Sequence, residues 1–122
     1  MSDTTQYTRV LINSGNAWYI MGKVDSAIAY FRPALDLCLA HNDTMQALSA
    51  GLMLASMLTA KGELDQAMDM LNDNVLLART AGRPDMLAVS TFQRGVLLKQ
   101  ARRGAEALAA FEETWKLCDS IG

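Results

Sequence analysis

The chain has 122 residues, of which 51% are hydrophobic and 20% are charged, and its formal net charge is −2. This length and composition are typical of one small globular domain and exclude an intrinsically disordered chain. No apolar run approaches the roughly 20 residues of a membrane helix, and the first residues show no secretory signal, so we expect a cytoplasmic location.

The chain repeats itself at an offset of 40 residues. Positions 27, 67 and 107 are all alanine, positions 31, 71 and 111 are large and apolar, and positions 15, 55 and 95 are glycine or alanine. A constant offset without insertions is typical of repeat architectures, in which each unit packs on its neighbours. We therefore expect one domain over 1–122, built from repeats at about 5–42, 44–82 and 84–122.

Within each repeat the apolar residues recur with the 3.6-residue period of an amphipathic helix, and no stretch alternates as a strand would. Gly22 and Gly62 stand just past the first helix of their repeats, where a residue with positive φ ends a helix. Asp25 and Asp65 follow as expected N-caps, and Pro84 is an expected first helical residue. The predicted helices cover 5–21, 25–41, 44–61, 64–81, 84–101 and 104–120.

A few residues depart from this regular pattern. Pro33 falls inside the second predicted helix, where it costs roughly 3 kcal/mol, so we expect a kink there. Arg94 stands where the previous repeat has Leu54, so either its stem lies along the core edge or the third repeat is slightly rotated. Cys38 and Cys118 share one repeat position, and we expect both to be small buried hydrophobes too far apart for a disulfide.

The repeat positions resemble the tetratricopeptide repeat (TPR). The first repeat reads Gly15-x-x-Trp18-x-x-x-Gly22-x-x-x-x-Ala27-x-x-x-Phe31-x-x-Ala34. The third repeat departs from the pattern with Arg102 in place of the turn glycine, and Asn74 and Thr114 replace the last small residue. The 40-residue period and the segment from Ile12 to Trp18 are similar to the Leu-Gly-Asn subclass. The later repeats keep Ala55, Leu58, Gly62, Ala67 and Leu71, then Gly95, Leu98, Ala107 and Phe111.

This resemblance implies an all-α, right-handed superhelical solenoid of three helix-turn-helix repeats, with six helices. It also implies a concave groove that binds a protein or peptide and is lined by the first helix of each repeat. The layout of the family places these residues on that inner face: Arg9, Ile12, Asn13, Asn16, Tyr19, Leu52, Met53, Ser56, Thr59, Val89, Phe92, Gln93, Val96 and Lys99.

Two kinds of side chain in this set suit binding. Asn13 and Asn16 can both donate and accept hydrogen bonds, as a peptide backbone requires. Leu52, Met53 and Phe92 would form an exposed apolar patch of the kind that marks an interface, unless curvature or self-association covers them. TPR proteins that clamp the C-terminal carboxylate of a chaperone use Lys, Arg and Asn at positions that are here Ile12, Asn16, Met53, Val89 and Gln93, so we do not expect that activity.

The last predicted helix has no following helix to pack against. Its apolar residues Leu108, Phe111, Trp115 and Cys118 would then be left exposed over an area that soluble monomers rarely show. We expect a second copy of the chain or another partner to cover this face, and we favour a homo-oligomer.

No residue pattern points to catalysis. His41 is the only histidine, and the sequence has no Cys-x-x-Cys, no His-Glu-x-x-His and no glycine-rich phosphate loop. We therefore expect no enzyme activity, no metal and no cofactor. The basic residues are scattered on helices, which is usual for solvated side chains, so we expect no nucleic acid and no membrane as partner. They are Arg79, Arg83, Arg94, Lys99, Arg102 and Arg103.

The leading hypothesis is a non-catalytic protein-interaction module, an adaptor or chaperone that binds a peptide or helix. One alternative is a ligand-sensing or regulatory TPR module of a signalling or transcription-control system. Another is an assembly scaffold or secretion chaperone in an obligate complex.

Overall fold

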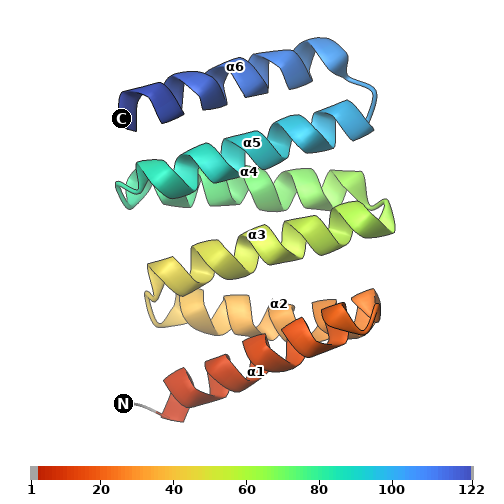
Figure 1. Ribbon diagram of the computed structural model, residues 1–122. Helices are drawn as coiled ribbons and strands as arrows, with labels where there is room; N and C mark the ends of the chain where they lie inside the picture. Colours follow the sequence, from red (N-terminus) through yellow and green to blue (C-terminus); the bar gives the residue numbers. More distant parts are fainter. Residues whose placement is uncertain (1–2, 122) are drawn as a thin grey trace.

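The computed structural model describes residues 3–121, and within that range it consists of six α-helices without a strand (Figure 1). The predicted all-α architecture is confirmed, and no helix end differs from its predicted position by more than two residues. The helices are α1 (Asp3–Ile20), α2 (Val24–Ala40), α3 (Thr44–Lys61), α4 (Leu64–Thr80), α5 (Pro84–Gln100) and α6 (Gly104–Ile121).

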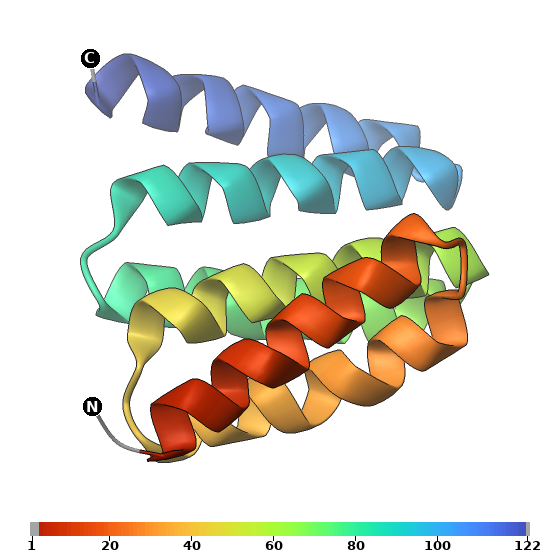
Figure 2. The same ribbon diagram turned by 60° about the horizontal axis from the view of Figure 1, so that its bottom comes forward.

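The helices stack in chain order, each antiparallel to the one before, with the two ends of the chain at opposite ends of the stack (Figure 1). Figure 2 turns this stack so that α1 lies in front, crossing over α2 and α3. Each helix packs on its neighbours in the chain, and α3 also contacts α5. The molecule is an all-α repeat solenoid in which the first helices of the second and third repeats share one side.

The turns between the helices have one common geometry that recurs every 20 residues. In each turn one residue has a left-handed backbone, and its own N–H and the next N–H both donate to carbonyls of the preceding helix. This Schellman arrangement satisfies carbonyls that the helix end leaves unpaired. The left-handed residues are Gly22 (φ 78°), Asn42 (φ 57°), Gly62 (φ 83°), Gly82 (φ 65°) and Arg102 (φ 63°).

The positive φ predicted for Gly22 and Gly62 is thus confirmed, whereas the predicted N-caps Asp25 and Asp65 are wrong. The helices α2 and α4 begin directly after residues 23 and 63, so both aspartates lie in the first helical turn. A carboxylate there is still favourable because it faces the positive end of the helix dipole. Pro84 is confirmed in the first turn of α5.

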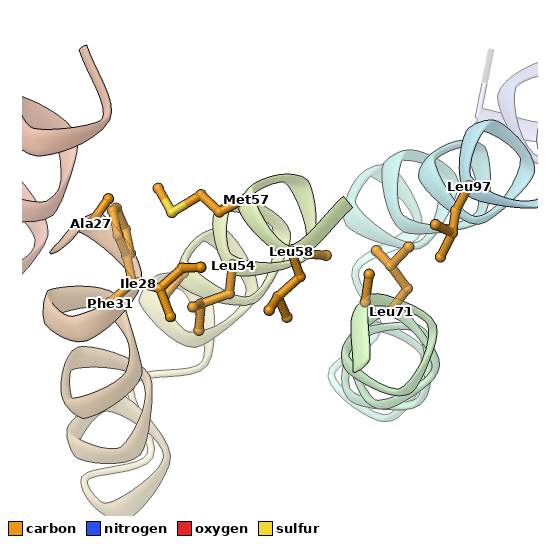
Figure 3. Close-up of a cluster of buried hydrophobic side chains, with 11 residues drawn as sticks. Ala27, Ile28, Phe31, Leu54, Met57, Leu58, Leu71 and Leu97 are labelled. Atoms are coloured by element: carbon orange, nitrogen blue, oxygen red, sulfur yellow. The ribbon is translucent and has the colours of Figure 1, made fainter. Parts of the chain in front are cut away.

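The core runs through the stack from α2 to α5. Figure 3 shows Phe31 and Ile28 of α2 beside Leu54 of α3, and Leu71 of α4 beside Leu97 of α5, all of them buried. Small residues allow the helices to approach each other. A Cβ built on the buried Gly15 would lie 2.5 Å from the Phe31 ring, so the small and large repeat positions meet in one contact.

Asn74 is a buried polar residue within this apolar stack. Its Nδ2 donates to the Leu48 carbonyl oxygen of α3 and to Ser90 Oγ of α5, both at 3.2 Å. A Cβ on Gly51 would collide with Asn74 Oδ1. The residue that departs from the small repeat position therefore connects three helices, and Gly51 leaves the space for it.

The other irregular residues have different outcomes. Pro33 is exposed and α2 continues through it without interruption. Cys38 is buried as expected, and burial, together with nearby Asp43, raises the pKa of its thiol. The expected burial of Cys118 is wrong, because no helix follows α6 within the described stack; both thiols are free.

Arg94 is partly buried, whereas Leu54 at the same repeat position is fully buried. This agrees with a stem that lies along the edge of the core. The Arg94 Nε is buried, and no hydrogen-bond acceptor reaches it from the described residues. The third repeat thus contains an unsatisfied donor that the second repeat does not have at this position.

Candidate binding groove

A depression of about 300 Å³ lies between α3 and α5 on the side that these two helices share. It is open to solvent and brings together five of the predicted groove residues with one other. Its lining consists of Ser56, Thr59, Phe92, Gln93 and Val96, together with Leu97.

The apolar wall of this depression belongs to α5. Phe92 is 49% exposed and Val96, one turn later, is 41% exposed. The Phe92 ring packs on the Phe111 ring of α6, with centroids 5.6 Å apart and planes inclined by 52°. Tilted aromatic pairs of this kind are favourable beyond their buried area. Phe92 is therefore supported on one side by α6 while its other surface is available to a ligand.

The polar wall joins α3 to α5. Ser56 Oγ donates to Gln93 Oε1 at 3.2 Å, which leaves the Gln93 amide nitrogen without an acceptor among the described residues. Thr59 Oγ1 donates within α3 to the Ala55 carbonyl oxygen at 2.7 Å. The depression therefore offers an amide donor next to an exposed aromatic ring.

The predicted groove residues of α1 lie elsewhere. Arg9 and Asn13 line a second open depression of about 310 Å³, together with Gln6 and Val10. Asn16 is partly buried and Tyr19 is exposed. These side chains do not contribute to the depression between α3 and α5.

The apolar residues expected in the groove are not equally available. Ile12, Leu52 and Met53 are partly buried and pack against the core cluster, so they expose less surface than the sequence predicts. Lys99 is exposed but does not line the depression between α3 and α5. Among the apolar residues that line the depression between α3 and α5, Phe92 and Val96 are the exposed ones.

Two contributions were not recognised from the sequence. Leu97 lines the depression although its side chain is almost fully buried. Phe111, which the sequence places on the C-terminal face, also supports Phe92. The sequence identifies Phe111 as a large apolar residue of the repeat. The repeat pattern alone does not say which neighbouring helix its ring contacts.

The predicted C-terminal face is largely open. Leu108 is 60% exposed and Trp115 is 69% exposed, and Cys118 is exposed as well. Phe111 is partly buried, because it packs against Gly95 and Phe92. Among the described side chains of α6, the large apolar ones that are open to solvent are therefore those of Leu108 and Trp115.

Two members of the basic set are paired with carboxylates. Arg83 forms an ion pair with Asp85 at 3.2 Å, and Arg103 forms one with Glu106 at 2.6 Å. The hydrogen bond from Arg83 lowers the pKa of Asp85. Arg79 and Lys99 are exposed. Part of this basic charge is thus compensated locally.

Two further properties concern the described residues as a whole. They contain no cluster of three or more His, Cys, Asp or Glu side chains suited to holding a metal ion. No described helix combines the length and the apolar character required to cross a membrane.

Solved structures share this arrangement of helices at low sequence identity. The TPR domain of Arabidopsis FLU superposes with a TM-score of 0.87 at 12% identity, over 96% of this chain and 98% of that one. The fold is that of the tetratricopeptide repeat. The N-terminal domain of stress-induced protein-1 from C. elegans has a TM-score of 0.80 at 13% identity, over 96% of this chain and 88% of that domain.

A longer protein also contains this TPR arrangement. Aspartyl phosphate phosphatase F from Bacillus subtilis has a TM-score of 0.90 at 12% identity, over 99% of this chain. This chain spans only 32% of the length of that phosphatase. The sequence matches no protein-family model and no curated protein.

Proposed function

We propose that this TPR chain is a non-catalytic, cytoplasmic protein-interaction module, an adaptor or chaperone that binds a peptide or helix of a partner protein. The observation that carries the proposal is the half-exposed Phe92 ring, which Phe111 supports beside a depression of about 300 Å³. A supported aromatic side chain next to a recess is the kind of residue that dominates binding energy at interfaces.

The neighbouring groups suit a peptide with an apolar anchor. An apolar side chain of the ligand would pack on Phe92 and Val96, while the Gln93 amide donates to a backbone carbonyl of the ligand. In the same proposal, Asn13 and Asn16 of α1 contact the ligand further along the stack. Nucleic acid is not part of the proposal, because two of the basic residues already pair with carboxylates.

A display library of short random peptides, panned on the purified chain, tests the proposal without a known partner. We expect enrichment of peptides with one large apolar residue, and at least tenfold weaker binding of these peptides by Phe92→Ala. Val96→Ala should weaken binding in the same direction, and the double variant Asn13→Ala/Asn16→Ala should weaken it less than Phe92→Ala does.

Leu76→Ala is the matched control, since Leu76 of α4 is also an exposed large apolar residue and lies outside the groove lining. Its peptide affinity should equal that of the native chain. Melting temperatures of all variants separate lost binding from lost stability. The proposal would be contradicted if no peptide is enriched, or if Phe92→Ala and Val96→Ala both bind the enriched peptides with the affinity of the native chain.

The first alternative is a ligand-sensing or regulatory module. The volume of the depression lies at the lower end of the range of small-molecule sites, about 300–1,000 Å³. A thermal-shift screen with metabolites that stabilises the native chain but not Phe92→Ala would favour this alternative over peptide binding.

The second alternative is an assembly scaffold or secretion chaperone in an obligate complex. It is supported by the exposed Leu108 and Trp115 on α6. We propose that this face is an association surface, with a second copy of the chain as the favoured occupant. This role is independent of the groove.

A further inference from the structure

Two junctions inside the chain show how one repeat covers the next. At the first junction, between α2 and α3, Ala50 and Met57 of α3 are buried in one core cluster with Ile28 of α2. At the second junction, between α4 and α5, Ser90 and Leu97 occupy the same repeat positions as Ala50 and Met57 and are also buried. The same positions of a first helix therefore dock twice onto the preceding second helix.

The two ends of the stack present the two halves of such a junction without a partner among the described residues. Val10 of α1 corresponds to Ala50 and Ser90, yet it is 60% exposed. At the other end, Leu108 corresponds to the buried Ile28, and Trp115 corresponds to the buried Val75. Thus α1 has an unused docking side, which includes Val10. Helix α6 has an unused receiving side, which includes Leu108 and Trp115.

We infer that α6 binds α1 of a second copy of this chain, head to tail, so that the 40-residue step of the repeat continues from one molecule to the next. The inference rests on the proposed association role of α6 and specifies the surface of the second copy that covers it. Because such a contact joins two different surfaces, it need not close, and further copies can add.

The buried positions of this junction are chemically compatible. At the second junction, Asn74 and Ser90 form a hydrogen bond, and between copies the same positions would bring Thr114 next to Val10. Thr114 Oγ1 already donates to the Ala110 carbonyl oxygen within α6 at 2.8 Å. Burying this pair would therefore leave no side-chain donor unsatisfied, which is the main cost of covering polar groups.

The rim of the junction is compatible as well. At the first junction, Asp25 forms an ion pair with Lys61 at 2.7 Å. The corresponding positions between copies are Ala105 and Met21, both of which are exposed. Two apolar side chains replace the ion pair, so neither copy brings an unpaired charge to this contact.

Paired variants test the inference by sedimentation velocity and light scattering. The native chain, of 13.3 kDa, should show an average mass that rises with concentration and passes the value of a dimer. Val10→Glu blocks the docking side, and Trp115→Glu blocks the receiving side, so each variant alone should remain monomeric. An equimolar mixture retains one intact pair of surfaces and should give a one-to-one heterodimer. Leu76→Glu, at an exposed site on α4, should associate like the native chain.

The other outcomes are equally decisive. Dimers of Val10→Glu, together with monomeric Trp115→Glu and no heterodimer, would show a tail-to-tail contact and overturn the head-to-tail inference while leaving α6 as an association face. A native chain that stays monomeric up to submillimolar concentration would overturn both the head-to-tail inference and the association role of α6. Circular dichroism checks the fold of each variant. Ala17→Glu replaces Val10→Glu if the latter unfolds, because the exposed Ala17 of α1 corresponds to the buried Met57 and Leu97. Peptide binding by monomeric Trp115→Glu tests the groove separately.

Discussion

Gly95 of α5 lies so close to Phe111 of α6 that a Cβ on the glycine would come within 2.7 Å of Phe111 Cε1. The same relationship joins Gly15 to Phe31 two repeats earlier, at 2.5 Å. These glycines are thus needed for close helix contact. We expect Gly15→Ala to lower the free energy of unfolding by about 1–2 kcal/mol, since overpacking outweighs the gain in helix propensity.

Gly104→Ala is the matched control, because nothing lies within 4 Å of a Cβ at Gly104 in the first turn of α6. We expect it to be neutral or to stabilise by up to about 1 kcal/mol. Urea denaturation measures both variants. If Gly15→Ala is as stable as Gly104→Ala, then α1 and α2 can separate at this crossing without cost.

Arg102 has φ 63° in a turn where the corresponding residue of the previous repeat is Gly62. A left-handed backbone is unfavourable for residues with a side chain, and Arg102 is exposed, so its replacement removes no packing. We expect Arg102→Gly to raise the free energy of unfolding by about 0.5–1 kcal/mol after the larger entropy of unfolded glycine is counted. Thermal unfolding should show the opposite shift for Gly62→Arg. If both variants melt at the same temperature as the native chain, the left-handed residues in these turns are not strained.

The buried Arg94 Nε, which has no acceptor among the described residues, predicts a stabilising substitution. Arg94→Leu restores the residue found at this position in the second repeat and removes an unsatisfied donor. We expect a gain of about 1–3 kcal/mol in calorimetric or urea unfolding. Arg79→Leu, at an exposed arginine of α4, should bring no gain. A loss of stability in Arg94→Leu would show that the guanidinium contributes favourable contacts that outweigh its buried nitrogen.

The two cysteines should differ in reactivity. Burial raises the pKa of the Cys38 thiol and so lowers its thiolate fraction at neutral pH, whereas Cys118 is exposed. In dilute protein, a thiol reagent should modify one group quickly and the second only as the chain unfolds. Cys118→Ser should abolish the fast phase, and Cys38→Ser should leave it unchanged. Fast modification of Cys38 would mean that α2 opens readily from the stack.

The sequence predicted the helices well, because the periodic apolar positions and the turn glycines are local signals. The N-caps were missed for a physical reason. Each turn continues only one residue beyond its left-handed residue, so the helix restarts before Asp25 and Asp65 are reached. Cys118 was expected to be buried because Cys38 shares its repeat position, but that position is buried only where another helix follows.

The groove was predicted less completely. Ser56, Phe92, Gln93 and Val96 do meet in one depression, since equal spacing along α3 and α5 places them on the same side. The partial burial of Met53 depends on its packing against the core cluster and on the side chains that the neighbouring helices bring to that cluster. These are properties of the assembled helices and are not visible in any single repeat.

Asn74 uses its amide nitrogen to hold both its own repeat and the next one, through Leu48 and Ser90. The first junction has Ala34 and Ala50 at the corresponding places, and neither side chain can form this bond. The repeats are therefore not interchangeable in order. A chimera in which the first and third repeats exchange places would put Val10 against Asn74 and leave a buried amide hydrogen unbonded, at a cost of about 1–3 kcal/mol.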